Sequence, residues 1–222
     1  MKILGIETTG EYFCIGVYDN GRVYEYGLKA ERRLSDIIDQ SIKRVLEALG
    51  WKAQDIDYFA CGLGPGSFTG IRIGIATIKG LSWAVNKPVI GIPSLDILAA
   101  NCPYPGKVVA ALDARRELVY CGVYELKNAR LAKTKPYMLL SKENFFKKIK
   151  GRPYILGNAV ALYREDILKR MPRATLLGHD YWRPQARNII ALALESIRRK
   201  KINDTFSVQP IYLYPKECQV KK

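Results

Sequence analysis

Hydrophobic and polar positions along the chain predict a definite order of strands and helices. Residues 2–7, 12–18 and 22–28 are short apolar or β-prone runs, and Asp19-Asn20-Gly21 between the last two is typical of a hairpin turn. Between residues 35 and 49, isoleucine, valine and leucine recur at helical spacing, and Gly50 follows as a helix end. The next predicted elements are a strand at 58–61, a helix at 70–86, a strand at 87–91 and a helix at 94–100.

The most distinctive stretch runs from residue 58 to residue 83. A buried strand stops at Gly62-Leu63-Gly64-Pro65-Gly66, which predicts a tight turn, and Ser67 or Thr69 can cap the helix that follows. That helix is apolar on nearly every side, so it must be covered on all sides. Gly66, Gly70 and Gly74 recur at every fourth residue. Two interpretations remain open: a core helix packed on its own sheet, or a helix that also contacts another subunit.

This glycine-rich turn does not match the common nucleotide-binding loops. A phosphate loop of the P-loop type needs lysine after its closing glycine, whereas Ile71 follows Gly70 here. The dinucleotide fingerprint fails as well, because Thr69 stands where its third glycine belongs. The turn alone therefore indicates only a generic anion site.

The second half of the chain repeats the beginning. Residues 101–106, rich in proline and glycine, mark a boundary, which predicts one domain at 1–103 and another at 104–222. A strand that ends in an acid occurs at residues 5–7 and at 111–113, and a returning strand occurs at 16–19 and at 122–125, all with an offset of 106. Further strands are predicted near 131–139, 153–156 and 174–177, and helices at 141–149, 159–171 and 184–201.

Two duplicated mixed α/β domains are typical of the actin-like, sugar-kinase (ASKHA) fold. In that fold the acids that follow the first strands face a cleft between the domains and can hold a hydrated metal ion on a nucleotide phosphate. The candidate cleft residues are Glu7, Thr8, Thr9 and Asp113. The alternative is that each acid only caps a turn, and Arg115 and Arg116 lie close enough to neutralise Asp113.

Composition excludes several classes of protein. No stretch of eighteen uncharged apolar residues predicts a membrane span, and no signal peptide is visible after Met1. The five cysteines lack any C-x-x-C spacing, which favours a reducing, cytoplasmic compartment. His179 is the only histidine, so a site with paired histidine ligands is excluded, and we expect no metal centre.

Positive charge is concentrated in the second half of the chain. Residues 1–126 hold 14 Lys and Arg against 14 Asp and Glu, whereas residues 127–222 hold 22 against 7. Such an asymmetry favours a polyanion such as RNA as a partner of the second half. A lysine-rich solvated surface is the alternative, because no RNA-binding motif and no interleaved exposed aromatic residues are visible.

Five segments together resemble the TsaB (YeaZ) family. They are ILGIETT at the start, CGLGPGSFTGIRIGIATIKGL from Cys61, PVIGIPSLDILA from Pro88, LDAR from Leu112 and QPIYLYP from Gln209. The resemblance implies the actin-like fold and a non-catalytic scaffold role in N6-threonylcarbamoyladenosine modification at adenosine 37 of tRNA. It also implies a catalytic TsaD-like partner, a TsaE-like ATPase, and a homodimer when the chain is alone. Transfer RNA would be bound indirectly or through the basic second half.

The resemblance also implies where partners bind. Family members associate through the helices at 35–49 and 70–86, so the candidate interface residues are Ile38, Ile42, Gly66, Phe68, Gly70, Arg72 and Gly74. Many relatives carry histidine where this chain has Leu34, which leaves the details of that surface open. We expect no required cofactor, although ATP or ADP with Mg²⁺ could bind at or near the interface. The alternative function is a nucleotide-hydrolysing or phosphotransferring enzyme of the same fold.

Overall fold

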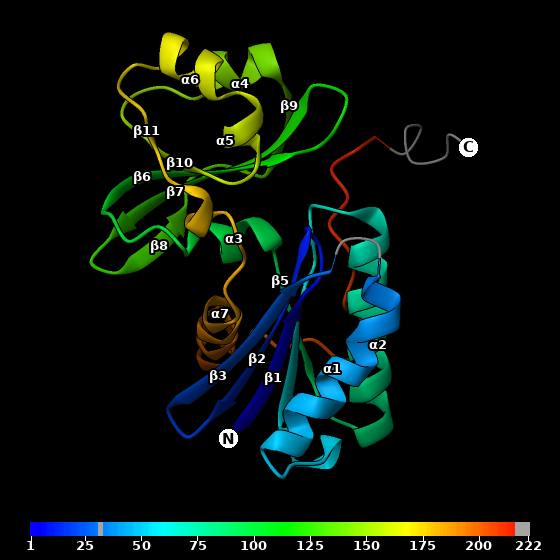
Figure 1. Cartoon of the computed structure of the whole chain (residues 1–222). Helices are drawn as coiled ribbons and strands as arrows, with labels where there is room; N and C mark the ends of the chain where they lie inside the picture. Colours follow the sequence, from blue (N-terminus) through cyan, green and yellow to red (C-terminus); the bar gives the residue numbers. More distant parts are fainter. Residues whose placement is uncertain (31–32, 216–222) are drawn as a thin grey trace. The chain divides into compact units, whose positions relative to one another are not determined.

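The structure, a computed structural model, describes residues 1–30 and 33–215 (Figure 1). It divides into two compact units. The first unit comprises Met1–Ile97 and Pro184–Ile211, and the second comprises Leu98–Arg183 together with residues 212–215. No helix in the described part of the chain is long and apolar enough to cross a membrane.

A five-stranded mixed sheet forms the centre of the first unit. Its strands lie in the order β3-β2-β1-β4-β5, with bounds Lys2–Glu7 for β1, Tyr12–Asp19 for β2, Arg22–Lys29 for β3, Tyr58–Gly62 for β4 and Val89–Ile92 for β5. Strand β2 runs antiparallel to both β1 and β3, whereas β4 is parallel to β1 and to β5. These strands confirm the predicted ones to within about two residues.

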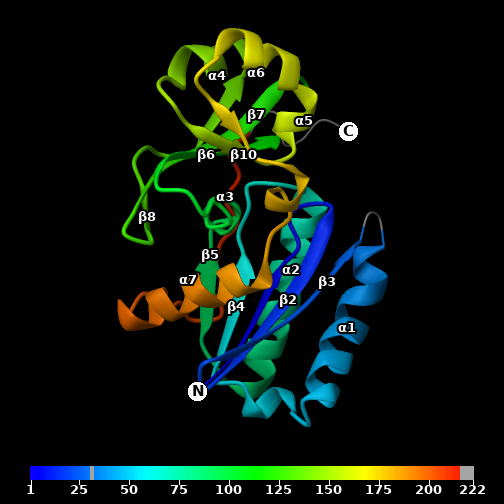
Figure 2. The ribbon, with the colours of Figure 1, turned by 60° about the vertical axis from the view of Figure 1, so that its left-hand side comes forward.

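Helices cover both faces of this first sheet (Figures 1 and 2). Helices α1 (Leu34–Ala48) and α2 (Phe68–Val85) lie side by side on one face, and α7 (Ala186–Arg198) crosses the other. The short helix α3 (Ser94–Ala99) follows β5, and a 3-10 turn, η1 (Ala53–Asp55), precedes β4. Leu34 at the start of α1 is buried.

The position of α7 corrects the predicted domain boundary. Residues 184–211 were predicted to lie in the second domain, but they pack on the first sheet. Glycine makes the close approach possible: a Cβ on Gly5 would meet Ile189 Cγ2 at 2.7 Å, and one on Gly16 would meet the Ala186 carbonyl oxygen at 2.8 Å. Gly5 and Gly16 are paired across β1 and β2. Because neither has a side chain, the surface of the sheet is flat where α7 packs on it.

The second unit also contains a mixed sheet, with strands in the order β11-β10-β6-β7-β8 and with β9 paired to β7. The strands are β6 (Gly106–Asp113), β7 (Leu118–Lys127), β8 (Arg130–Lys133), β9 (Met138–Ser141), β10 (Tyr154–Leu156) and β11 (Thr175–Leu176). The helices are α4 (Lys142–Lys148), α5 (Ala159–Leu162) and α6 (Arg164–Arg170), followed by a 3-10 turn η2 (His179–Tyr181). A buried apolar cluster joins these three helices to one face of the sheet.

Two predicted elements of the second unit are each divided in the structure. The predicted strand at 131–139 is two strands, β8 and β9, separated by a segment that contains Pro136, which has no N–H to donate. The predicted helix at 159–171 is two helices, because Tyr163 leaves the helical conformation (φ −119°, ψ 21°).

The two sheets have the same topology, which confirms the predicted duplication and fold class. Strands β8-β7-β6-β10-β11 repeat the order β3-β2-β1-β4-β5, with three antiparallel strands followed by two parallel ones. The single offset of 106 is wrong for the returning strand. Glu7 pairs with Cys14 whereas Asp113 pairs with Val119, so the offset is 113 − 7 = 106 for the acids but 119 − 14 = 105 for their partners.

Candidate functional site

The acid at the end of β1 is fully buried and held within the first unit. Thr9 N donates to Glu7 Oε1 at 2.6 Å, and Ser94 Oγ, at the start of α3, donates to Glu7 Oε2 at 2.8 Å. Gly62, at the end of β4, is so close that a Cβ there would collide with Glu7 Oε2. Each carboxyl oxygen therefore accepts a hydrogen bond from a residue of the same unit.

The same hydrogen-bond network fixes the glycine-rich turn at 62–66. Ser94 N donates to the Gly64 carbonyl oxygen at 2.9 Å, and Gly64 N donates back to Ser94 Oγ at 3.0 Å. Ser67 N donates to the Thr9 carbonyl oxygen at 2.7 Å. Gly64 has φ +89°, which a residue with a side chain rarely adopts. Ser94 was predicted only as a helix cap, and its role in this network was missed because its partners are distant in sequence.

Burial dominates the electrostatics of Glu7. Loss of water around the carboxyl raises its pKa above the ordinary value, and the hydrogen bonds from Thr9, Ser94 and Thr8 oppose that rise. Two buried thiols flank it on the neighbouring strands. Burial, together with the Glu7 carboxyl, raises the pKa of Cys61 to about 12 and raises that of Cys14 as well, so both cysteines behave as small apolar side chains.

The glycine row of α2 faces its own sheet. A Cβ on Gly70 would collide with the Thr8 carbonyl oxygen, one on Gly74 with Thr8 Oγ1, and one on Gly66 with the Thr9 carbonyl oxygen. Thr8 Oγ1 donates to the Gly70 carbonyl oxygen at 2.8 Å, so a hydrogen bond also joins α2 to the residues that follow β1. The sequence left two interpretations of α2 open, and the structure shows the first of them: the helix packs as a core helix within its own unit.

The predicted interface residues divide into buried and exposed sets. Ile38, Ile42, Gly70 and Gly74 are buried within the first unit, and Gly66 is half-buried. Phe68 and Arg72 are exposed, and the Arg72 guanidinium lies 3.7 Å from the centre of the Phe68 ring. The interface role of all seven residues stays a prediction.

The described residues do not cover helix α2 on all sides, contrary to the expectation for an apolar helix. One row of exposed residues runs along α2 at helical spacing, and we call it the exposed stripe of α2. It consists of Phe68, Arg72, Ala76, Gly80 and Trp83. Trp83 is 70% exposed, and the sequence did not single it out as a site residue. The sequence contains only a weak signal, a tryptophan in a helix with few polar residues, and such a residue is more often buried.

Asp113, the counterpart of Glu7, ends β6 in the second unit. Its Oδ1 accepts a hydrogen bond from Arg115 N at 2.8 Å, and Arg115 Nη1 lies 3.4 Å from Oδ2. The Asp113 backbone N–H donates to Asn158 Oδ1. Asp113 therefore closes a turn and pairs with arginine, which is the alternative that the sequence favoured for it. Glu7 and Asp113 belong to different units, and the shared cleft expected for them stays a prediction.

Candidate metal ligands are not clustered. Within residues 1–30 and 33–215, no group of three or more His, Cys, Asp or Glu side chains could hold a metal ion. His179 lies against the Trp182 ring and 3.3 Å from Arg183 Nη2. Cys14, Cys61, Cys102 and Cys121 are buried and free, and Cys218 lies outside the described residues.

Known proteins place this architecture in a family. The family model described as TsaD, tRNA N6-adenosine threonylcarbamoyltransferase, matches residues 28–173, which is more than half of the chain. The tRNA threonylcarbamoyladenosine biosynthesis protein TsaB of Buchnera aphidicola subsp. Schizaphis graminum is 30% identical over 92% of this chain and 98% of its own length. The chain belongs to the TsaB family. TsaB of Bacillus subtilis is 28% identical, over 100% of this chain and 97% of the relative.

Solved structures agree with the TsaB assignment. YeaZ from Pseudomonas aeruginosa superposes with a TM-score of 0.83 and 25% identity, over 96% of this chain and 99% of that chain. The likeness to TsaB proteins thus extends over both units and is not limited to the glycine-rich turn. It includes residues 184–211, whose return to the first sheet was not predicted from the sequence.

Proposed function

We propose that this TsaB-family chain is a subunit of the machinery that makes N6-threonylcarbamoyladenosine in tRNA, where it acts as a non-catalytic scaffold for a TsaD-like catalytic subunit. The observation that carries the proposal is the full-length relationship to proteins named for this biosynthesis. A TsaE-like ATPase is a further member of the proposed assembly. The proposed site of action is the cytoplasm, where tRNA is modified.

The buried Glu7 supports a scaffold rather than an enzyme. A carboxylate that holds a hydrated metal ion on a nucleotide needs solvent access, whereas Glu7 is fully buried with both oxygens bonded inside its own unit. Asp113 is paired with Arg115. The alternative of a nucleotide-hydrolysing or phosphotransferring enzyme therefore lacks a free acid at the expected positions. The proposed scaffold requires no cofactor of its own.

The exposed stripe of α2 is the surface that we assign to a partner subunit. An apolar helix needs cover on all sides, whereas in this stripe Phe68 is 42% exposed and Trp83 is 70% exposed. The stripe contains both tryptophan and arginine, which are enriched among the residues that dominate binding energy at protein interfaces. The occupant that we propose is the TsaD-like subunit, and a second copy of this chain takes the same surface when that subunit is absent.

A reconstituted modification assay tests the function. The assay combines tRNA, threonine, bicarbonate, ATP and the partner components, with and without this chain. We expect modification to depend on the chain and to survive Glu7→Gln, which keeps the shape of the side chain and one of its two acceptor oxygens. A loss of turnover by orders of magnitude in a folded Glu7→Gln protein would indicate the enzyme instead. Modification that proceeds without the chain would overturn the proposal altogether.

The partner surface is tested by solution mass, with a variant chosen to leave the core intact. Gly74→Glu is unsuitable, because any side chain at Gly74 collides with Thr8. Trp83→Glu changes a side chain that is 70% exposed and should abolish assembly with the partner while the free energy of unfolding stays within about 0.5 kcal/mol. Arg164→Glu, an exposed charge change on α6 of the second unit, is the control. Assembly equal to wild type in Trp83→Glu would exclude the exposed stripe of α2 as the contact.

A further inference from the structure

Six basic residues gather at one end of the sheet of the second unit. The parallel strands β6, β10 and β11 all begin at this end, and β7 runs antiparallel to β6, so it finishes there. Lys107 is the second residue of β6; Lys127 and Arg130 face each other across the turn between β7 and β8. Lys150 and Arg152 precede β10, and Arg173 precedes β11. We call these six residues the basic rim.

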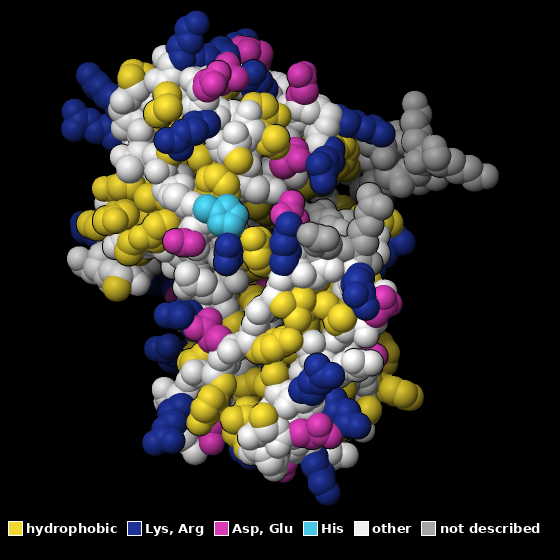
Figure 3. Space-filling view, in the orientation of Figure 1, with side chains coloured by type: hydrophobic (Ala, Val, Ile, Leu, Met, Phe, Trp, Pro, Cys, Tyr) yellow, Lys and Arg dark blue, Asp and Glu magenta, His cyan; other side chains and the backbone are white. Residues whose placement is uncertain are grey.

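The basic rim is exposed and continuous. Five of the six side chains are exposed, and Lys107 is half-buried with its Nζ donating to the Lys150 carbonyl oxygen at 2.7 Å. The rim extends over the five strands from β11 to β8, which at about 4.8 Å per strand is about 19 Å. In Figure 3, Lys and Arg side chains project from the side of the second unit around β11, and hydrophobic side chains lie below them on that side.

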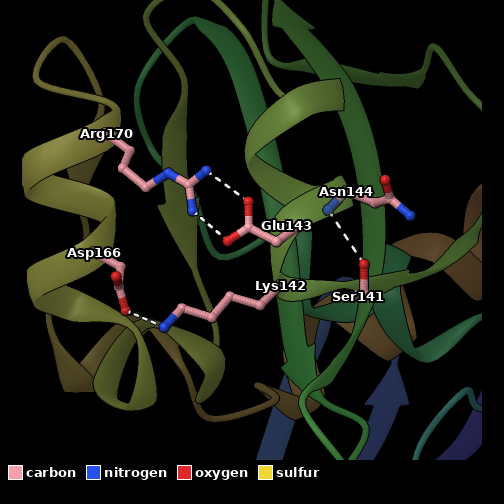
Figure 4. Close-up of polar contacts among 6 residues, drawn as sticks. All are labelled: Ser141, Lys142, Glu143, Asn144, Asp166 and Arg170. Atoms are coloured by element: carbon pink, nitrogen blue, oxygen red, sulfur yellow. Dashed lines mark hydrogen bonds and ion pairs between the residues drawn. The ribbon is translucent and has the colours of Figure 1, made fainter.

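Charges at the basic rim are not neutralised, in contrast to those between the helices of the same unit. Lys142 pairs with Asp166 at 2.5 Å, and Arg170 makes a two-bond contact with Glu143 at 2.6 and 2.7 Å (Figure 4). Among the described residues, no rim side chain forms an ion pair with an acid. Glu125, opposite Lys107 on β7, is an acid at this end of the sheet. The paired charges stabilise the helices, whereas the rim charges remain available to a ligand.

An aromatic pair stands at the same end of the sheet. Tyr104, two residues before β6, is 43% exposed and stacks on Tyr154, the first residue of β10, with ring centroids 5.2 Å apart. Gly106 lies beside the Tyr154 ring, and its φ of +122° is a backbone conformation that favours glycine. Basic side chains beside a stacked, exposed aromatic ring are the combination by which proteins hold single-stranded nucleic acid. This exposed aromatic residue was not recognised from the sequence.

We propose that the basic rim binds the phosphate backbone of tRNA and that Tyr104 stacks on an unpaired base of it. The inference rests on the proposed function, which makes tRNA the polyanion that the assembly must hold. Lysine and arginine contacts to phosphates supply affinity without reading sequence, and stacking selects a segment whose bases are not paired. The chain thereby contributes a tRNA contact from its second unit, separate from the exposed stripe of α2 in the first.

Charge-reversal variants of matched net charge test the basic rim. Binding of fluorescently labelled, unmodified tRNA is measured at several salt concentrations, for the full chain alone and for its complex with the catalytic partner. Lys150→Glu with Arg152→Glu should lower affinity at least tenfold and reduce the slope of log affinity against log salt by about 1.5. The control, Arg116→Glu with Arg164→Glu, makes the same change in charge at exposed positions away from the rim and should stay within about twofold of wild type.

Substitutions of Tyr104 test the stacking contact. Tyr104→Ala should weaken tRNA binding by about fivefold or more with an unchanged salt slope, whereas Tyr104→Phe, which keeps the ring, should bind like wild type. Solution mass of each variant with the partner shows whether the assembly is intact.

The outcomes separate this inference from the proposed function. Equal tRNA affinity for the rim variant and the charge-matched control would overturn the rim. If modification still depends on the chain in that case, the scaffold function stands without it. Unchanged tRNA affinity combined with lost assembly would assign the rim to an acidic protein partner and would equally overturn the RNA contact.

Discussion

At the scale of single residues, Glu7 shows how a chemically suggestive side chain can be structural. A carboxyl group after a β-strand is what a nucleotide site would need, but this one is fully buried and bonded to Thr9 and Ser94. Burial of an ionised carboxyl is unfavourable, so the hydrogen bonds are needed for it to be tolerated. In return it joins the end of β1 to the start of α3, and Ser94 extends the connection to the glycine-rich turn through Gly64.

The raised pKa of Glu7 predicts how stability depends on pH. A carboxyl that holds its proton more tightly when folded adds stability below its ordinary pKa of 4.5, and this stability is lost as the pH rises through the folded-state pKa. Urea unfolding of wild type and of Glu7→Gln, measured from pH 4.5 upward, checks this. The free energy of unfolding of the wild type should fall relative to that of the variant, because glutamine does not ionise. Parallel curves would contradict the assignment.

At the scale of elements, the buried side and the exposed side of α2 place different requirements on its sequence. The buried side needs glycine, since Gly70 and Gly74 touch the Thr8 backbone and hydroxyl. The exposed side, which includes Gly80 and Trp83, meets no part of the described chain that would cover it. Helix propensity alone would disfavour so many glycines, so packing determines the sequence on the buried side.

Alanine substitutions at two glycines of α2 should have opposite effects. Gly74→Ala places a Cβ against Thr8 Oγ1 and should lower the free energy of unfolding by about 1–3 kcal/mol, despite the better helix propensity of alanine. Gly80→Ala meets no atom within 4 Å and should raise it by up to about 1 kcal/mol. Urea denaturation of both variants measures the difference. A stabilised Gly74→Ala protein would mean that α2 does not approach β1 as described.

The sequence predicted the positions of the helices and strands better than the contacts between residues that are distant in sequence. Periodicity located the strands of the first sheet and the helices α1 and α2 to within about two residues, because each has a clear pattern of buried positions. The contact of Ser94 with Glu7 spans 87 positions and left no local pattern. The buried state of Ile38 and Ile42 followed from periodicity, whereas the exposure of Trp83 and the stacking of Tyr104 on Tyr154 depend on which neighbours the fold supplies.

At the scale of the whole molecule, the chain returns to its beginning. After the second unit, residues 184–211 rejoin the first sheet through α7 and through Asn203, which exchanges two backbone hydrogen bonds with Val89. The buried side of α7, which includes Ile189, Ile190 and Ala193, packs on the face of the sheet where Gly5 and Gly16 have no side chains. A domain boundary drawn from composition cannot detect such a return, because α7 is an ordinary amphipathic helix whose apolar side fits any sheet.

The first unit should therefore fold only when its two segments are both present. Residues 1–97 alone leave the apolar seat of α7 in water, so this fragment should aggregate or unfold. Joining residues 1–97 to 184–211 by a short Gly/Ser linker should restore cooperative urea unfolding. The link is feasible because Asn188 Nδ2 donates to the Ile97 carbonyl oxygen at 3.3 Å, which places the two ends close together.

A matched control carries Ala193→Asp in the fused chain, where a charge is buried in the contact with the sheet. If residues 1–97 unfold as cooperatively as the fusion, α7 is an accessory to the first unit rather than part of its core.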